Sequence, residues 1–451
     1  MINNMKNTAN QHLQPITTKV NNENHLEIGG CDLVNLAQEY KTPLYIIDEE
    51  TLRSICKDYK RAFETYENTV QFLYASKALC TKAIFKIISQ EEFGCDIVSE
   101  GELYTALSAG MNPEKILFNG NNKGYEELEY AVKSNIGRFS VDNFLELSNL
   151  NEIAEKENKV VNIFIRITPG IDCWTHDYIK TGKIDSKFGF NMSEIDTVIE
   201  LLQNKYKNLK LRGLHAHIGS QIFETECFKD EVEILIKQYV RLREKYSLEF
   251  DEINLGGGYG IKYTEDDTPL SLFDLGEVVI SAMNENCEKY GIKKPKIYLE
   301  PGRSTICTSG VTIYKIGNIK HIPNVRTYVA VDGGMTDNIR PALYGAKYTA
   351  VLANKMNSDE ELKKVRVVGK LCESGDILID EIELPNPQKD DILCVFNTGA
   401  YNYSMSSNYN RVKKPAMILV NKSQSDIIIN RETFEDLTRN DIIPKRFEKQ
   451  W

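Results

Sequence analysis

The feature that most constrains the fold is a regular alternation of strand-like and helical segments between Thr69 and Leu299. Eight apolar runs are typical of strands, at 69–75, 94–98, 115–118, 136–141, 161–167, 211–217, 252–255 and 296–299. The segments between them carry helical patterns, and a further helical stretch at about 50–66 precedes the first strand. Eight strand–helix units in roughly 250 residues predict a (β/α)8 barrel. A doubly wound open sheet explains the alternation equally well but predicts no particular count.

The pattern changes after Gly302, where strand-like runs are separated by turns. These runs lie at 308–322, 326–334, 364–372, 391–399 and 414–423. They predict a second, mainly β domain, with which the segment 26–46 is expected to pair. We therefore expect a polar N-terminal extension at 1–25, a barrel at 47–303, and a β domain built from 26–46 and 304–451.

Composition narrows the class of partner. A net charge of −10 with no basic block argues against nucleic acid. No run approaches the ~18 apolar residues of a membrane span, and residues 1–28 lack the apolar core of a secretory signal. The ten cysteines show no CxxC pair and no regular spacing. Reduced thiols in the cytoplasm are therefore expected, with no disulfide framework.

Polar and glycine residues follow four of the expected barrel strands, where barrels place their functional groups. Lys77 follows the first strand, and His217 and Ser220 follow the sixth. The seventh strand is followed by Gly256, Gly257 and Gly258, and the eighth by Glu300, Pro301, Gly302 and Arg303. An amine, an imidazole, a glycine turn and a Glu/Arg pair are thus expected at one mouth.

These groups together indicate a cofactor. Three successive glycines let backbone N–H groups turn toward a phosphate, although the run matches neither GxGxxG nor a Walker motif. A lysine that forms a Schiff base, a phosphate nest and a carboxylate facing a pyridinium nitrogen describe a pyridoxal 5'-phosphate site. Singly, each feature has an ordinary explanation, such as a structural ion pair or a tight turn; their order on successive strands is the stronger signal.

A metal site is not expected. His215 and His217 share one face of a strand, but the chain has only six histidines and no acidic residue at matching spacing. His217 is better placed to stack on a cofactor ring.

The motifs YASKA, HIGSQ, LGGGYG and EPGR, in this order, resemble those of barrel-type pyridoxal phosphate amino-acid decarboxylases, which share their fold with alanine racemase. The segments at 176–190, 332–348, 367–378 and 397–410 are similar to the diaminopimelate decarboxylase family in particular. The likeness runs from about residue 26 to about 423, with no departure at a motif position.

The resemblance implies roles for individual residues. Lys77 would carry the cofactor, His217 would stack on its ring, and Glu300 would bond the pyridine nitrogen. The phosphate region would be held by Ser220, Gly256 to Gly258 and Tyr401. Arg303, Arg340, Tyr344, Glu373 and Tyr401 would line the substrate, and Cys372 would donate a proton. The implied reaction removes CO2 from the D-centre of meso-2,6-diaminopimelate to give L-lysine, in a homodimer whose CESGD segment enters the partner's site.

The chemistry of decarboxylation is consistent with these residue types. A cation on the leaving carboxylate would stabilise the ground state more than the transition state and slow the reaction. Two arginines make sense if they grip a carboxylate that stays, for which the guanidinium fork is suited. Glu373 can pair with the distal ammonium, and a thiol with pKa about 8.5 can serve as an acid at neutral pH.

Other functions remain open on the sequence alone. A decarboxylase of the same fold acting on ornithine or arginine is the nearest, although such substrates leave the element from Arg340 to Tyr344 without a role. Racemase chemistry needs a second acid/base on the opposite face. A third alternative is a non-catalytic pyridoxal phosphate-binding regulator, and the presence of Lys77, Cys372 and Glu373 together weighs against it.

Overall fold

The computed structural model describes residues 7–170 and 186–447, which divide into two compact units. The first unit consists of residues 7–16 together with Glu50–Ser309. The second consists of Thr17–Glu49 together with residues 310–447. Both units are therefore built from segments that are far apart in the sequence.

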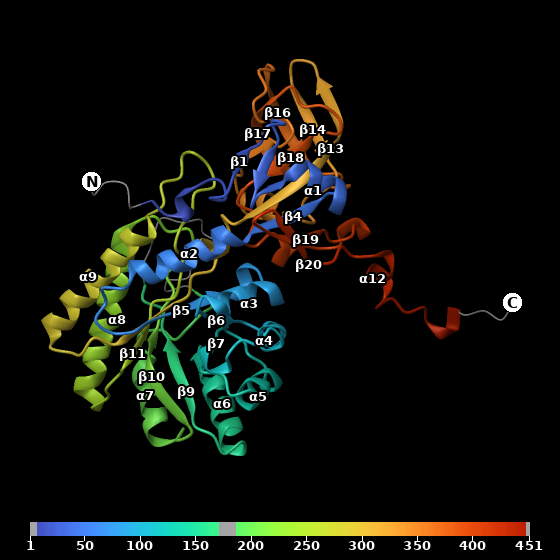
Figure 1. Ribbon diagram of the computed structural model, residues 1–451. Helices are drawn as coiled ribbons and strands as arrows, with labels where there is room; N and C mark the ends of the chain where they lie inside the picture. The colour runs from blue at the N-terminus through green and yellow to red at the C-terminus, as the bar shows by residue number, and fades with distance from the viewer. Residues whose placement is uncertain (1–6, 171–185, 448–451) are drawn as a thin grey trace. The chain divides into compact units, whose positions relative to one another are not determined.

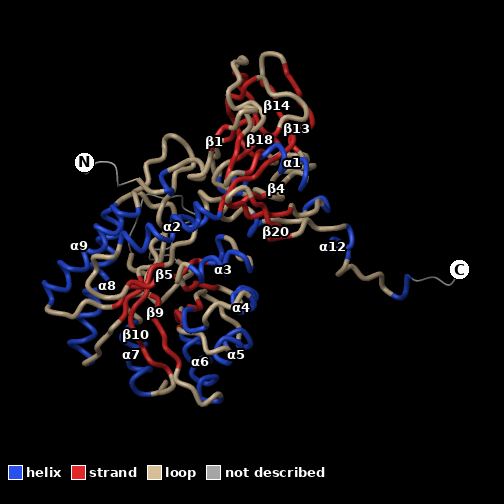
Figure 2. Tube along the Cα trace, viewed as in Figure 1, coloured by secondary structure: helices blue, strands red, loops and turns tan. Residues whose placement is uncertain are grey.

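The first unit contains a closed barrel of eight strands, in which each pairs in parallel with the next and the last pairs with the first. The strands are β5 (Val70–Ala75), β6 (Gly94–Ile97), β7 (Ile116–Phe118), β8 (Arg138–Val141), β9 (Val161–Arg166), β10 (Leu209–His215), β11 (Glu252–Asn254) and β12 (Lys296–Leu299). All eight fall on the apolar runs of the sequence. The predicted (β/α)8 barrel is confirmed, and Figure 2 shows its strands inside a layer of helices.

The helices of this layer alternate with the strands along the chain (Figure 1). They are α2 (Glu49–Ala62), α3 (Lys82–Gln90), α4 (Glu100–Ser108), α5 (Tyr125–Lys133), α6 (Phe144–Lys156), α7 (Ile195–Asn204), α8 (Thr225–Tyr246) and α9 (Leu272–Tyr290), with a short α10 (Arg303–Ile306) after β12. Side chains cap several of them: Ser99, for example, accepts from an N–H in the first turn of α4. Gly291 ends α9 at a φ of 58°, the left-handed conformation that glycine tolerates best.

The second unit is mainly β, as expected. Its strands are β1 (Lys19–Val20), β2 (Leu26–Ile28), β3 (Cys31–Asp32), β4 (Leu44–Asp48), β13 (Gly310–Ile322), β14 (Arg326–Val331), β15 (Ala350–Leu352), β16 (Leu362–Val368), β17 (Ile377–Pro385), β18 (Ile392–Val395), β19 (Ala416–Asn421) and β20 (Gln424–Ile429). Its helices are α1 (Leu33–Tyr40), α11 (Arg340–Tyr344) and α12 (Phe434–Thr438). β4 lies between β13 and β19, which confirms that the N-terminal segment pairs with this domain.

The described residues at the beginning of the chain contact the barrel unit. Asn10 donates to the carbonyls of Gly260 (3.2 Å) and Leu270 (2.8 Å), and Thr8 Oγ1 accepts from Leu272 N (3.0 Å). Thr8 therefore satisfies one backbone N–H at the start of α9, and Asn10 ties the N-terminal residues to the loop before that helix.

The cysteines differ in part from expectation. Within residues 7–170 and 186–447, eight cysteines are free, but Cys227 at the start of α8 is disulfide-bonded. Across the described residues, none of the helices is both long enough and apolar enough to span a bilayer.

Candidate active site at the C-terminal mouth of the barrel

Lys77 lies directly after β5, in the short helical turn η2 (Ser76–Ala78). Ser76 Oγ fixes this turn by donating to Asp96 O (2.7 Å). The Lys77 side chain is exposed and forms no hydrogen bond or ion pair with any of the described residues. It is an accessible amine, as a covalent anchor for a carbonyl compound requires.

Glu300 follows β12 and is buried, with partners on both carboxylate oxygens. Oε1 accepts from Asn119 Nδ2 (3.0 Å) and Asn254 Nδ2 (2.8 Å), while Oε2 lies 3.6 Å from His215 Nε2. Burial alone would raise the pKa of this carboxyl, but His215 and Asn254 more than offset it and hold the pKa of Glu300 well below its usual range. The group is therefore an anion, suited to bonding a protonated ring nitrogen.

Asp96 shares an amide with Glu300, since Asn119 Nδ2 also donates to Asp96 Oδ1 (2.6 Å). Burial, and then the charge on Glu300, raise the pKa of Asp96 well above its usual range. The pKa values of these two neighbouring carboxyl groups are thus shifted in opposite directions, upward for Asp96 and downward for Glu300.

His217 follows β10 and is held by the glycine turn. The backbone N–H of Gly257 donates to His217 Nδ1 (3.1 Å), so Nδ1 is an acceptor and carries no proton. In agreement, burial and the charges of Lys77 and Arg166 hold the pKa of His217 well below its usual range. The imidazole is neutral, and a neutral ring can stack on an aromatic cofactor without adding a charge.

The glycine run after β11 is required by close backbone approaches. Gly256 and Gly258 have φ values of 58° and 109°, and a Cβ on Gly257 would lie 2.2 Å from Glu300 O. A Cβ on Gly258 would meet Gly219 O at 2.5 Å. The loops after β10, β11 and β12 therefore meet at this turn, and larger residues would separate them.

Arg303 is the first residue of α10, and its side chain binds residues of the loops that follow β10 and β11. Its guanidinium donates to Ser220 Oγ (3.0 Å) and to Tyr263 Oη (2.8 Å). Ser220 and Arg303 were both predicted in the site, and the structure brings them together. Gly302, just before Arg303, lies against Ala75 at the end of β5.

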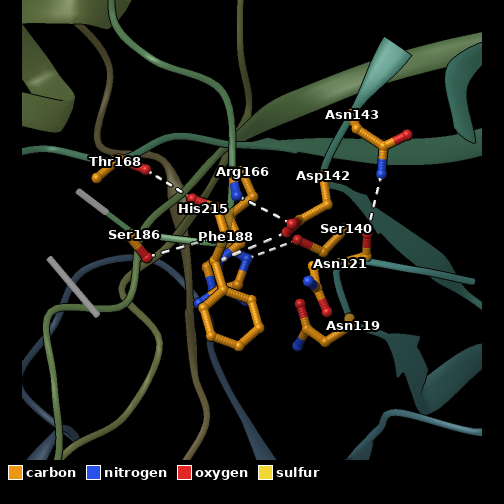
Figure 3. A network of polar contacts seen from close by, with 12 residues as sticks. Asn119, Asn121, Ser140, Asp142, Asn143, Arg166, Thr168, Ser186, Phe188 and His215 are labelled. Atoms are coloured by element: carbon orange, nitrogen blue, oxygen red, sulfur yellow. Dashed lines mark hydrogen bonds and ion pairs between the residues drawn. The ribbon is translucent and has the colours of Figure 1, made fainter. Parts of the chain in front are cut away.

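A polar network that sequence reasoning missed surrounds His215 (Figure 3). Ser140 Oγ lies 2.6 Å from His215 Nδ1, and Asp142 Oδ1 lies 3.8 Å from Arg166 Nε. The Arg166 guanidinium also lies 4.5 Å from the ring centre of Phe188. Apart from Phe188, these residues lie at or directly after the ends of β8, β9 and β10, so applying the strand-end rule to every strand would have found Asp142 and Arg166.

Cys372 and Glu373 belong to the second unit, in the loop between β16 and β17, and both side chains are exposed. The loop itself is firmly held: the buried carboxylate of Asp376 accepts from Leu371 N (2.8 Å) and Met335 N (2.6 Å). Cys372 N also donates to Asn410 Oδ1 (2.9 Å). A fixed loop thus presents a free thiol and a carboxylate to its surroundings.

Arg340 and Tyr344 open and close the one-turn helix α11 in the second unit. Arg340 is buried and donates to Tyr348 Oη (2.5 Å), a partner that sequence reasoning did not name. Tyr401 is half-buried with a φ of 64°, an unusual conformation for a tyrosine. Residues 176–185 of the motif at 176–190 lie outside the described residues.

Among the described residues, His215 lies 2.6 Å from Ser140 Oγ and 3.6 Å from Glu300 Oε2, and His217 Nδ1 accepts from Gly257 N. One cluster of possible ligands, Glu23, His25 and Asp32, occurs in the second unit. Asp32 caps α1 and pairs with His25 (2.9 Å), which accounts for their contact without an ion.

The barrel groups fit pyridoxal 5'-phosphate. An ionised carboxylate matches a protonated pyridine nitrogen, and an amine free of other partners matches the aldehyde. Gly256 N and Gly257 N already donate to Asn254 Oδ1 and His217 Nδ1, so the donors suited to a phosphate here are Gly258 N, Ser220 Oγ and the Arg303 guanidinium.

Comparisons with known proteins agree with this chemistry. The model of the pyridoxal-dependent decarboxylase family, pyridoxal binding domain, matches residues 50–307. Diaminopimelate decarboxylase from Bacillus subtilis is 45% identical over 437 residues, which cover 96% of this chain and 99% of that relative. The Synechocystis enzyme of the same name is 45% identical, covering 97% of this chain and 95% of that one.

Solved structures are similar over the same length. The crystal structure of diaminopimelate decarboxylase from M. jannaschii superimposes with a TM-score of 0.90 at 34% identity, covering 96% of this chain and all of that one. The Helicobacter pylori enzyme, complexed with L-lysine, has a TM-score of 0.83 at 32% identity, covering 90% of this chain and 98% of that one. The chain belongs to the diaminopimelate decarboxylases, within the pyridoxal-dependent decarboxylase family.

Proposed function

We propose that this protein removes CO2 from the D-centre of meso-2,6-diaminopimelate and releases L-lysine, the last step of lysine biosynthesis, with pyridoxal 5'-phosphate as cofactor. The observation that carries the proposal is the buried Glu300 carboxylate, ionised by His215 and Asn254 at the mouth where Lys77 presents its amine. When bound, the cofactor withdraws electrons from the bond to the leaving carboxylate.

The chain's own residues have separate tasks in this proposal. Lys77 binds the cofactor covalently, and His217 packs its neutral ring on the cofactor. Glu300 keeps the ring nitrogen protonated, because an adjacent anion raises the affinity of that nitrogen for a proton. Ser220, Arg303, the turn at Gly256 to Gly258, and Tyr401 hold the phosphate.

The substrate is held by its second amino-acid centre. Arg303, Arg340, Tyr344 and Tyr401 bind the carboxylate that stays, and Glu373 pairs with the distal ammonium. Leaving the departing carboxylate without a cation favours its loss as neutral CO2. Cys372 then supplies the proton that replaces it.

The direct test is CO2 release by the purified protein. It is assayed on meso-, LL- and DD-diaminopimelate, ornithine and arginine, with and without added pyridoxal phosphate. We expect turnover of the meso isomer that depends on the cofactor, with little turnover of the monocarboxylates. Preference for ornithine or arginine would replace the proposal by a diamine-forming decarboxylase, and cofactor binding without CO2 release from any substrate would favour a regulator.

The protein acts as a homodimer with shared active sites in this proposal. The exposure of Cys372 and Glu373 on a rigid loop supports it, because such a loop is suited to entering another subunit. Lys77→Ala and Cys372→Ala subunits, each inactive alone, should regain part of the activity when mixed and allowed to exchange. If mass spectrometry proves the exchange and no activity returns, Cys372 acts within its own subunit.

A cytoplasmic location also belongs to the proposal. The eight free cysteines support a reducing compartment, while the disulfide at Cys227 weighs against it. Thiol titration of the protein extracted under alkylating conditions would decide between the two.

A further inference from the structure

A cavity of about 610 Å3 lies at the N-terminal mouth of the barrel, at the opposite ends of the strands from Lys77 and Glu300. Its lining includes the first residues of β7, β8, β9 and β12. Barrel enzymes place their reaction at the other mouth. A cavity here is therefore separate from the site described above, and its size is that of a small-molecule site.

The inner wall of this cavity is apolar. Leu73, Leu117 and Tyr298 line it, and the three belong to one buried hydrophobic cluster inside the barrel. Phe139 and Ile116 extend the same wall. These five side chains are at most 2% exposed, so they close the floor of the cavity and offer an occupant little apolar surface.

The rim of the cavity is cationic. Lys115, Arg138, Lys159 and Lys296 line it, against the single acid Glu114. Arg138 is already paired, because it donates to both carboxylate oxygens of Glu252 (2.6 and 2.5 Å). The three lysines form no ion pair within the described part of the chain: Lys115 donates to Glu92 O (3.0 Å) and Lys159 to Val132 O (2.7 Å).

Within the described ranges, Lys296 differs from the other three cations in its lack of polar partners. It is half-buried and has neither a hydrogen-bond acceptor nor an acidic partner among the residues that the structure describes. Its ammonium lies 4.7 Å from the ring centre of Tyr298, and the Arg138 guanidinium lies 4.9 Å from the same centre. Burial and the charge of Arg138 lower the pKa of Lys296. A second cation and partial desolvation both disfavour its charge, and a bound anion would relieve both.

We propose that this cavity binds a small organic anion whose acid group pairs with Lys296. The cationic rim selects a carboxylate, sulfonate or phosphate over a neutral ligand, and a cavity of about 610 Å3 has room for the organic body that carries it. This site is independent of the proposed decarboxylase activity.

The test is isothermal titration of the cofactor-loaded protein with 2-naphthoate and with its uncharged counterpart 2-naphthamide. We expect saturable binding of naphthoate with about one site per chain, and binding of the amide weaker by about tenfold or more. Lys296→Met, which keeps the side-chain length but removes the charge, should weaken naphthoate binding by a similar factor. Lys293→Met, an exposed lysine three residues earlier that does not line the cavity, should leave binding unchanged.

A second variant guards against a change in folding. Asn162→Trp, at the half-exposed cavity lining on β9, should narrow the cavity and also weaken binding without altering any charge. Unfolding temperatures of all variants establish that they are native. The proposal is overturned if native Lys296→Met binds naphthoate as tightly as the wild type, if the amide binds as tightly as the acid, or if no binding occurs at millimolar concentrations.

Discussion

The imidazole of His215 and the carboxylate of Glu300 face each other inside the barrel, with Nε2 and Oε2 3.6 Å apart and both side chains buried. Ser140 orients the imidazole from its other nitrogen, at 2.6 Å from Nδ1. The remaining oxygen of Glu300 is held by two amides. The charge state of Glu300 is thus set by three residues, from β10, β11 and the loop after β7.

His215→Leu should therefore remove the main influence that keeps the pKa of Glu300 low. A buried carboxylate that loses a polar partner is destabilised by about 2–5 kcal/mol. We expect weaker cofactor binding, and an activity profile whose acidic limb moves to higher pH because Glu300 now protonates more readily. Ser140→Ala keeps the imidazole and should cost only about 1 kcal/mol. A His215→Leu protein with unchanged stability and an unchanged acidic limb would show that His215 does not act on Glu300.

Asp337 in the second unit gives a pH-dependent prediction. Burial raises its pKa from 3.8 to about 7, although Gly334 N donates to Oδ1 (2.7 Å). A carboxyl with a raised folded pKa stabilises the native state fully below its unfolded pKa, and that stabilisation is lost as pH rises through the folded pKa. Between about pH 5 and pH 7 the loss is about 1.4 kcal/mol per pH unit.

Asp337→Asn keeps the oxygen that accepts from Gly334 but cannot ionise. Its free energy of unfolding relative to the wild type should therefore increase by about 2–3 kcal/mol from about pH 5 to pH 7. Urea denaturation at the two pH values measures the difference. Asp426→Asn, an exposed carboxyl on β20, is the control and should show no such trend. A constant difference for Asp337→Asn would mean that Asp337 does not hold a proton in the native state.

The ion pair of Lys123 and Glu146 is almost completely buried, with the two side chains 1% and 2% exposed. Lys123 Nζ donates to Glu146 Oε1 (2.7 Å) and to the carbonyls of Gly120 and Ser140. Lys123→Met should destabilise the protein by about 3–5 kcal/mol, because it leaves a buried charge without its partner. The double variant Lys123→Met/Glu146→Leu should regain much of the stability that Lys123→Met loses.

The matched control is the exposed pair of Glu152 and Lys156, which lies on the same helix α6. Lys156→Met should cost less than about 1 kcal/mol. Thermal denaturation of the wild type and the three variants provides the comparison. If the Lys123→Met loss is as small as that of Lys156→Met, the buried pair contributes no more than a surface one.

The barrel was predictable because each strand carries its own signal. β12, for example, coincides with the predicted run at 296–299. β10 begins two residues earlier than predicted, since Leu209 and Lys210 are fixed by pairing with β9 rather than by their own pattern. β17 and β20 carry many polar residues and pair at or near the edges of the sheet, so their sequences gave little sign of strands.

The site was predictable only where a motif marks a residue that follows a strand. Asn119 lies 181 residues from Glu300 along the chain, and a contact of this kind depends on the closure of the barrel. The Arg340–Tyr348 contact was missed for a different reason. Arg340 and Tyr348 are close in the sequence. The sequence does not show, however, which of the nearby tyrosines accepts the hydrogen bond from the Arg340 guanidinium.

Arg340 also carries the prediction that separates diacid from diamine substrates. Arg340 is buried and donates a hydrogen bond to Tyr348. These contacts are consistent with a purely structural role, and equally with a guanidinium that binds the substrate carboxylate and is oriented by the Tyr348 hydroxyl. Losing a buried, hydrogen-bonded charge partner costs about 2–5 kcal/mol, which is on the order of 30-fold to several-thousand-fold in kcat/KM.

If Arg340 grips the carboxylate that stays, Arg340→Met should lose that factor with meso-diaminopimelate and much less with D-lysine, which lacks the distal carboxylate. Stability and cofactor binding should change little. Tyr348→Phe, which removes only the hydroxyl, should reduce kcat/KM for diaminopimelate by about tenfold or less, because the guanidinium remains but is less well oriented. If Arg340 has only a structural role, we expect instead that Arg340→Met lowers the unfolding temperature and reduces kcat/KM equally for the two substrates. A folded Arg340→Met protein with near-normal kcat/KM for diaminopimelate would exclude the clamp, and the ornithine- or arginine-type decarboxylases would then be the better description of the pocket.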